Sequence, residues 1–224
     1  MNLVTIKKAI KESIPVMMGY LVLGFAFGML LISKGYPIYY ALIMSCFIYA
    51  GSMQFVTVTL LVNQASLISS FIMTLMVNAR HLVYGLSMLK KFEGMKKLKP
   101  YMIFSLTDET FSLLVKNDCQ DKYLAFFISF FDQCYWIIGS LIGASIGSQI
   151  SFNSQGLEFS MTALFIVIVI NQIKSRSGHL ATLIGFIVSI SCLIIFKSEH
   201  FVIFAMLLIM TILIFMKPRL ENES

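Results

Sequence analysis

The chain has 224 residues, of which 58% are hydrophobic and 12% charged, and its mean hydropathy is +0.86. Soluble domains carry about 25% charged residues, so this composition excludes a water-soluble globular protein. A membrane span needs about 20 apolar residues, which leaves room for about seven crossings and predicts a single membrane domain.

Apolar stretches separated by short polar joints follow one another along the chain. Because lipid tolerates only helices or closed barrels, and no period-two alternation occurs, the sequence predicts an all-α integral membrane protein, a polytopic helix bundle. The predicted segments lie near 13–33, 38–62, 66–89, 101–115, 123–148, 158–173, 179–196 and 200–216. They define a cytoplasmic N-terminal segment (1–12), a transmembrane transport domain (13–217) and a short polar tail (218–224).

The first apolar stretch follows basic residues, as in a signal peptide, but it runs from about Ser13 to Ile32. That length is enough to span, and no small-x-small cleavage site follows, so we expect a retained first helix. Its glycines are expected to allow close packing against another helix. They are Gly19, Gly24 and Gly28.

The basic residues gather beside the apolar stretches, in Lys7–Lys11, Lys90–Lys99, Lys174–Arg176 and Lys217–Arg219. This pattern, with a net charge of +6, is typical of cytoplasmic loops and argues against nucleic-acid binding. Three simple crossings would place the first two clusters on opposite sides of the membrane. We therefore expect a discontinuous helix near 45–60 and a re-entrant segment near 101–116, as in transporters whose broken helices build a mid-membrane site.

Five ionisable side chains fall inside apolar stretches: Arg80, His81, Asp108, Glu109 and Asp132. A charge at the centre of a span costs about 2.5–3.5 kcal/mol, so these groups are expected to pair or to face water. The alternative is that Arg80 snorkels to an interface and that Asp108 and Glu109 lie among lipid headgroups.

A polar cluster surrounds Arg80, because Asn78, His81 and Tyr84 lie within one helical turn of it. Arg80, His81 and Tyr84 are predicted to share a helix face, with Asn78 more to the side. A guanidinium binds a carboxylate through two parallel hydrogen bonds, so Arg80 is expected to hold a substrate carboxylate or to pair with an aspartate, either Asp108 or Asp132.

Proton coupling is predicted to involve His81, Asp108, Glu109 or Asp132, because histidine titrates near neutral pH and buried carboxyls bind protons. The alternative for His81 is a hydrogen bond between helices.

The segment Ala50–Phe55 combines a backbone break with polar side chains. Free N–H groups at such a break, together with the dipole of a half-helix, suit a carboxylate. Gly51, Ser52 and Gln54 are therefore predicted substrate ligands, and close packing by small residues is the alternative for Gly51 and Ser52. An aliphatic pocket is expected from three aromatic residues, Phe55, Tyr84 and Phe111.

The sequence contains no phosphate-binding loop, HExxH metal site or nucleophile elbow. We therefore expect neither an enzyme nor a cofactor. The predicted function is secondary active transport driven by an ion gradient, with protons as the expected ion. A non-transporting membrane scaffold and a channel-like pore are the alternatives.

Five blocks of residues resemble, in order and from about residue 5 to 196, the AzlC family of branched-chain amino acid permeases. The blocks are Ile14-Pro15 with Gly19-Tyr20 and Gly24-x-Ala26-Phe27-Gly28, Ala50-Gly51-Ser52-x-Gln54-Phe55, Asn78-x-Arg80-His81-x-x-Tyr84-Gly85, Thr107-Asp108-Glu109-x-Phe111, and Gly156-Leu157-Glu158-Phe159-x-Met161-Thr162-Ala163-Leu164-Phe165. Glu158 stands where the family often has Asp, which keeps the charge.

The resemblance implies export of Leu, Ile, Val and related compounds such as Met or leucine analogues. For such an amino acid, we expect Asp108 or Glu109 to bind the ammonium group. It also implies a small hydrophobic partner subunit of the AzlD type, with this chain as the large subunit. The expected location is the cytoplasmic membrane of a bacterium, with multiple crossings and a cytoplasmic N-terminus.

Overall fold

The computed structural model describes residues 3–116, 121–149 and 179–196, together with individual helical residues between 159 and 173 and between 201 and 216. The chain forms two compact units, Met1–Met161 and Thr162–Ser224. Every element of the described part is helical, which confirms the all-α prediction. The segments expected near 158–173 and 200–216, and the basic clusters that follow them, lie largely outside the described residues.

Among the described residues, three helices are long and apolar enough to cross a membrane: α1 (Leu3–Ser33), α4 (Leu67–Met88) and α7 (Lys122–Gly147), all in unit 1. The number of about seven crossings stays a prediction. The α4 and α7 bounds agree with the predicted segments to within a residue. Helix α1 begins about ten residues before the predicted span, because the lysines and glutamate ahead of it are good helix formers that extend the helix beyond its apolar part.

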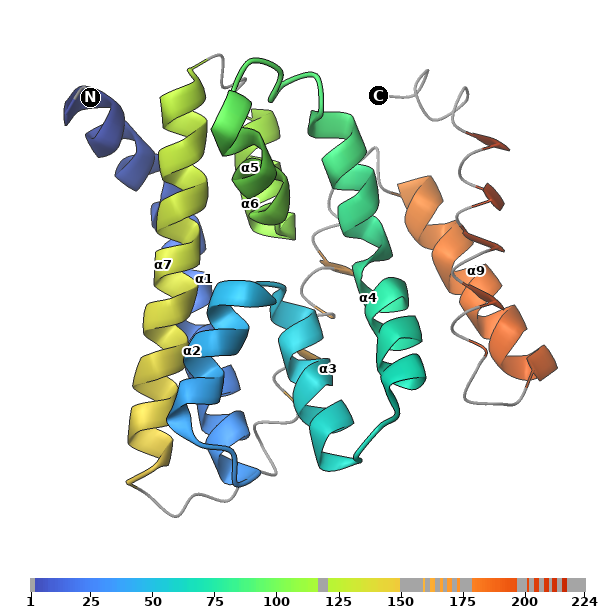
Figure 1. Cartoon of the computed structure of the whole chain (residues 1–224). Helices are drawn as coiled ribbons and strands as arrows, with labels where there is room; N and C mark the ends of the chain where they lie inside the picture. Colours follow the sequence, from blue (N-terminus) through green and yellow to red (C-terminus); the bar gives the residue numbers. More distant parts are fainter. Residues whose placement is uncertain are drawn as a thin grey trace. The chain divides into compact units, whose positions relative to one another are not determined.

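Short helices form two hairpins between the long ones (Figure 1). The first consists of α2 (Ile38–Phe47) and α3 (Gly51–Val62), and the second of α5 (Lys99–Phe104), preceded by a 3₁₀ turn at Lys96–Leu98, and α6 (Asp108–Lys116). At 1.5 Å per residue, α2 and α3 are about 15 and 18 Å long, roughly half the apolar thickness of a bilayer. The two hairpins enter unit 1 from opposite ends and turn back near its middle.

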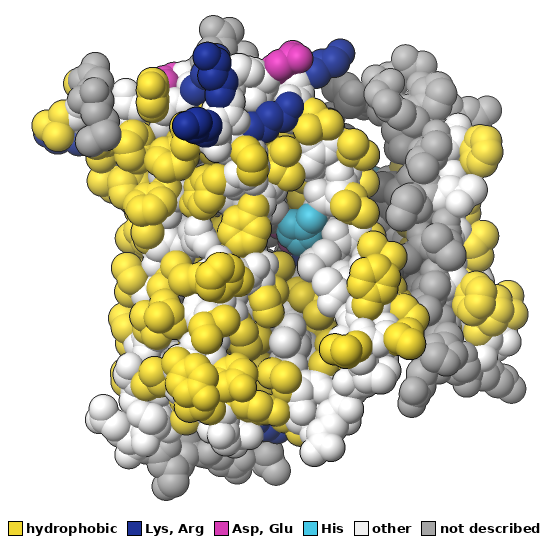
Figure 2. Space-filling view, in the orientation of Figure 1, with side chains coloured by type: hydrophobic (Ala, Val, Ile, Leu, Met, Phe, Trp, Pro, Cys, Tyr) yellow, Lys and Arg dark blue, Asp and Glu magenta, His cyan; other side chains and the backbone are white. Residues whose placement is uncertain are grey.

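This arrangement confirms the discontinuous helices predicted near 45–60 and 101–116. A long helix followed by a half-length hairpin occurs twice, once as α1 with α2–α3 and once in the opposite direction as α4 with α5–α6 (Figure 1). The N-terminus and the Lys90–Lys99 segment consequently lie at the same end of unit 1, where basic side chains gather in Figure 2. Hydrophobic side chains cover the flank between the two ends.

The first break lies at Ile48–Ala50, just before the glycine that the sequence indicated. Tyr49 adopts a left-handed φ of 35°, a conformation that costs a non-glycine residue about 1–2 kcal/mol. Gly51 begins α3, and a Cβ at this position would lie 3.0 Å from the ring of Trp136. Glycine at this position therefore allows close packing against the Trp136 ring of α7, while Tyr49 provides the turn.

Helices α1 and α7 are the most closely packed pair, with backbone against backbone. A Cβ at Gly24 or Gly28 of α1 would come within 2.9 or 2.1 Å of a carbonyl oxygen of α7, and Gly143 of α7 lies equally close to Phe25. This contact confirms the packing role predicted for Gly24 and Gly28. Gly19 has no neighbour within 4 Å of its Cβ position, so the same prediction is wrong for that residue.

The topology predicts which connections label from the same side of a membrane. In a chain with its four cysteines replaced, Ser33→Cys and Asn63→Cys are expected to react with an impermeant thiol reagent from one side. Lys8→Cys and Lys97→Cys are expected to react from the other. Reaction of positions 33 and 63 from opposite sides would show that α2–α3 crosses the membrane, contrary to the hairpin.

Unit 2 contains α9 (His179–Phe196), which was predicted near 179–196. Its aliphatic side chains are largely exposed within the described residues, and Phe196 stacks on Phe204 with ring centroids 4.4 Å apart. Such an apolar surface is consistent with a membrane helix.

Candidate functional site

Arg80 of α4 connects the tips of the two hairpins. Its Nη2 donates a hydrogen bond to Ser52 Oγ at 3.0 Å and forms an ion pair with Asp108 Oδ2 at 3.1 Å. Ser52 lies in the first turn of α3 and Asp108 begins α6, so one guanidinium nitrogen joins both breaks. The side chains of Arg80 and Asp108 are 28% and 23% exposed, so the ion pair is accessible to a ligand.

Tyr84, one turn after Arg80, fixes the other oxygen of the same carboxylate. Its hydroxyl donates to Asp108 Oδ1 at 2.9 Å, and its ring stacks on Phe111 with centroids 4.3 Å apart. His81 meets Tyr84 edge to face at 5.8 Å. The shared helix face predicted for Arg80, His81 and Tyr84 is therefore present, and it is directed toward α6.

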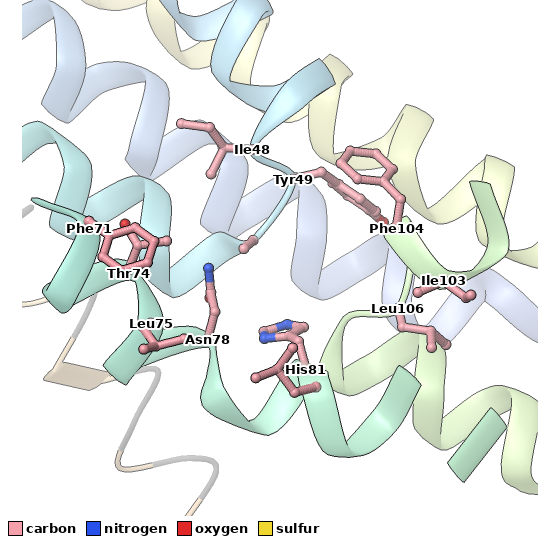
Figure 3. Close-up of a pocket in the computed structure, with 12 residues that line it drawn as sticks. Ile48, Tyr49, Phe71, Thr74, Leu75, Asn78, His81, Ile103, Phe104 and Leu106 are labelled. Carbon is pink, nitrogen blue, oxygen red and sulfur yellow. The ribbon is translucent and has the colours of Figure 1, made fainter. Parts of the chain in front are cut away.

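A cavity of about 350 Å³ lies between the first break, α4 and the second break (Figure 3). Arg80 and Asp108 do not line it, whereas His81, the residue after Arg80, does. Its volume falls in the range of small-molecule sites. The lining is mostly aliphatic and aromatic, with Asn78 and His81 as polar side chains directed into it. The lining residues include Ile48, Tyr49, Leu75, Ile103, Phe104 and Leu106.

Buried polar atoms without a hydrogen-bond partner in the described structure gather around these tips. They include Tyr49 Oη, Asn78 Oδ1, Arg80 Nε, His81 Nδ1 and Trp136 Nε1. An unpartnered buried polar group costs about 1–3 kcal/mol, and native proteins keep few of them. Several in one place are typical of a site that binds a polar ligand.

The N-terminus of α3 adds a positive end to the site. Ala50 precedes it in an extended conformation, and no side chain caps the first N–H groups of the helix. In contrast, α6 begins with Asp108 and Glu109, whose negative charges complement its own helix dipole. The tip of the first hairpin is therefore positive, because the start of α3 has no side-chain cap. The tip of the second hairpin is negative, because Asp108 and Glu109 begin α6.

Hydroxyl groups extend this site toward the α1–α7 contact. Tyr20 of α1 donates to Glu109 Oε2 at 2.9 Å and is in hydrogen-bond contact with Thr107. Thr107 caps α6 by accepting the Thr110 N–H at 3.2 Å. Thr110 in turn donates to Asp132 Oδ2 at 2.9 Å.

Most of the predicted site residues lie around the Arg80–Asp108 ion pair, but Gln54 and Phe55 do not. Gln54 is fully buried between the arms of the first hairpin, where its Nε2 donates to Ser45 Oγ at 3.2 Å. Phe55 packs on Phe27 in the core around Trp136, not beside Tyr84 and Phe111. None of the three aromatic residues predicted to form the aliphatic pocket lines this cavity. Its aliphatic lining comes instead from α4, α5 and the two breaks.

Two other predictions are settled by contacts. Arg80 pairs with Asp108, whereas Asp132 lies on the far side of Thr110 and has no ion pair among the described residues. Asn78, predicted to lie to the side of the face shared by Arg80 and Tyr84, lines the cavity with an unpartnered Oδ1. No group of three metal-binding side chains occurs among the described residues.

Sequence reasoning missed Tyr20, Tyr49, Thr107, Thr110 and Trp136. Tyr20 and Trp136 occur in apolar stretches where an aromatic residue is unremarkable, and only the fold brings them to α6 and Gly51. Thr107 followed by Asp108 and Glu109 was a recognisable helix start, because threonine is a preferred N-cap residue and acidic residues favour the first turn. It would have located the second break directly.

Comparison with known proteins places the chain in a family. The family model for the AzlC protein matches residues 15–150, which include both hairpins and Arg80. The chain is 44% identical over 219 residues to an uncharacterized membrane protein of Helicobacter pylori (strain ATCC 700392 / 26695), covering 96% of each chain.

The similarity extends to proteins of other bacteria. The chain is 41% identical over 222 residues to the branched-chain amino acid transport protein AzlC of Bacillus subtilis (strain 168), covering 97% of this chain and 87% of the relative. It is 28% identical over 189 residues to the inner membrane protein YgaZ of Escherichia coli (strain K12), covering 80% and 77%. No solved structure matches significantly. The family match and the near-full-length similarity show that the chain belongs to the AzlC family.

Proposed function

We propose that this chain is the large subunit of a secondary active transporter that exports branched-chain amino acids. The observation that carries the proposal is the Arg80–Asp108 pair at the meeting point of two half-length hairpins. Broken helices of this kind form the mid-membrane substrate sites of secondary transporters. The name of the Bacillus subtilis relative supports the substrate class.

A zwitterion fits between the two partners of the ion pair. Its carboxylate would replace Asp108 at the Arg80 guanidinium and accept hydrogen bonds from the uncapped start of α3. Its ammonium group would bind Asp108, with Glu109 next to it. Each charge of the site then keeps an opposite partner in the empty and in the loaded state, so binding leaves no charge unpaired at bilayer depth.

The cavity between the two breaks would hold the branched side chain. Ile48, Leu75, Ile103 and Leu106 provide an apolar lining, and removing a branched aliphatic side chain from water stabilises the complex by about 1.5–3 kcal/mol. Asn78 and His81 are close enough to the polar end of this cavity to orient the amino acid.

A second cavity supports a route toward the end of unit 1 opposite the basic clusters. It measures about 320 Å³ and is lined by the last turns of α1 and α3, including Lys34, Val62 and Asn63, and by Phe55, one turn along α3 from Ser52. If the basic end is cytoplasmic, as the distribution of lysines favours, this route leads out of the cell. Movement of one hairpin against the other would alternate access to the site.

The proposal includes a proton gradient as the driving force, a small AzlD-type membrane subunit as partner, and a bacterial cytoplasmic membrane as location. A channel-like pore and a scaffold are the competing functions. The hairpins favour a carrier, because their tips close the middle of unit 1 with an ion pair.

The test is flux of radiolabelled leucine from proteoliposomes that contain this chain, with and without the small subunit. We expect saturable efflux that external unlabelled leucine accelerates. Flux that rises linearly with leucine concentration would indicate a pore. No flux and no leucine binding in either preparation would favour a scaffold.

A further inference from the structure

Asp132 is a carboxyl group buried in the middle of α7. Its side chain has no exposed surface, and it lies ten residues, or about 15 Å, from the start of the helix. Thr110 donates to Oδ2, whereas Oδ1 has no partner and no described cation forms an ion pair with it. An unpaired buried carboxylate costs several kcal/mol, so a permanent charge at this position is unfavourable.

Three hydroxyl groups join Asp132 to the substrate site without interruption. Tyr20 contacts both Glu109 and Thr107, Thr107 donates to Thr110 Oγ1 at 3.0 Å, and Thr110 donates to Asp132. Tyr20, Thr107 and Thr110 are each no more than 5% exposed. Glu109 is next to the Asp108 carboxylate that pairs with Arg80, so the chain of hydroxyls ends at the proposed amino-acid site.

We propose that Tyr20, Thr107 and Thr110 form a proton relay between Glu109 and Asp132, and that Asp132 holds the proton that is coupled to transport. This inference rests on the proposed function, because it assigns a path to the ion that drives it. The inference gives these three uncharged side chains a role in transport, because they pass the proton between the two carboxyl groups.

The transfer balances in every step. A proton on Glu109 passes to the Tyr20 oxygen as Tyr20 gives its own proton to Thr107. Thr107 then gives its proton to Thr110, and Thr110 gives its proton to Asp132 Oδ2. Each hydroxyl ends with one proton, Glu109 is ionised, and Asp132 is a neutral carboxylic acid.

Within the described part of the chain, the titratable groups that face Asp132 contribute no positive charge. Glu109 of α6 interacts with it electrostatically, as do the phenols of Tyr20 on α1, Tyr49 at the first break and Tyr101 on α5. Asp132 therefore gains and loses its negative charge by exchanging a proton through the relay, and no described cation stabilises that charge.

The experiment measures leucine and proton movement together in proteoliposomes loaded with a pH-sensitive dye. Thr110→Val keeps the branched shape and the backbone N–H but interrupts the relay, and Tyr20→Phe interrupts it at the other end. We expect the number of protons moved per leucine to fall about tenfold or more in both variants, relative to the wild type and to the control variant. Thr57→Val is the control, because the Thr57 hydroxyl bonds only its own helix, at Met53 O.

Wild-type proton movement in both relay variants would overturn the inference. So would a wild-type protein that carries leucine but no protons, which would leave the proposed transport function in place. If the wild type carries no leucine, the proposed function fails, and infrared spectroscopy of the purified protein decides the relay separately. A protonated-carboxyl band that is lost in Asp132→Asn and shifted in Thr110→Val supports the relay, and a band unchanged by Thr110→Val overturns it.

Discussion

Replacing Arg80 by lysine is expected to lower the initial rate of leucine export about a hundredfold or more while the protein remains inserted. Lysine keeps the charge but cannot bond Ser52, Asp108 and a substrate carboxylate with a planar guanidinium. Loss of charge-assisted bonds to a substrate costs about 3 kcal/mol, which corresponds to that factor. Flux of labelled leucine from proteoliposomes measures the effect, and Asp108→Asn is expected to act in the same direction.

A double variant separates transport from folding. Arg80→Gln with Asp108→Asn removes both charges, so neither is left buried without a partner, and the two amides can still hydrogen bond. We expect the melting temperature of this variant in detergent to stay close to that of the wild type and export to remain lost. Recovery of export would mean that the ion pair only holds α4 to α6.

The largest expected loss of stability comes from Gly143→Ala on α7. The added Cβ would lie 2.0 Å from the carbonyl oxygen of Phe25 on α1. No side-chain rotation relieves this clash, because the contacted oxygen belongs to the backbone. Separating the two helices is expected to cost about 3 kcal/mol and to lower the melting temperature in detergent. Size-exclusion chromatography after heating measures the loss of the folded protein.

Gly19→Ala on α1 is the matched control. It makes the same chemical change within a long membrane helix, but nothing lies within 4 Å of the new Cβ. Alanine favours a helix over glycine by roughly 1 kcal/mol, so this variant is expected to melt at or above the wild-type temperature. Equal melting temperatures for the two variants would show that the close α1–α7 contact does not stabilise the protein.

The positions of the two broken helices were predictable from the sequence. Basic clusters at Lys7–Lys11 and Lys90–Lys99 require an even number of crossings between them, and the polar residues at Gly51–Ser52 and Asp108–Glu109 mark where the chain turns back. The distribution of basic residues along the whole chain predicted the two turns better than local helix propensity did, because it constrains all the crossings together. The local reason for each turn was less predictable, because the left-handed residue is Tyr49 and not Gly51.

The site was predictable where a charged residue lies in an apolar stretch. Arg80, Asp108 and Asp132 stand out because a charge in lipid is costly, and two of the three meet as an ion pair. The apolar cavity was not predictable, because its aliphatic lining residues look like any other membrane-helix residues. Tyr20 and Thr110 became recognisable only through contacts across 89 and 22 residues of chain.

The central claim is that a branched-chain amino acid binds with its carboxylate on Arg80. Solid-state NMR of the reconstituted protein can measure this directly with carboxyl-labelled leucine, after Arg176 and Arg219 are replaced by lysine so that Arg80 is the sole labelled arginine. Dipolar coupling is predicted to place the leucine carboxyl carbon within about 4 Å of the guanidinium nitrogens. Absence of that coupling at saturating leucine, in protein that still transports leucine, would contradict the account.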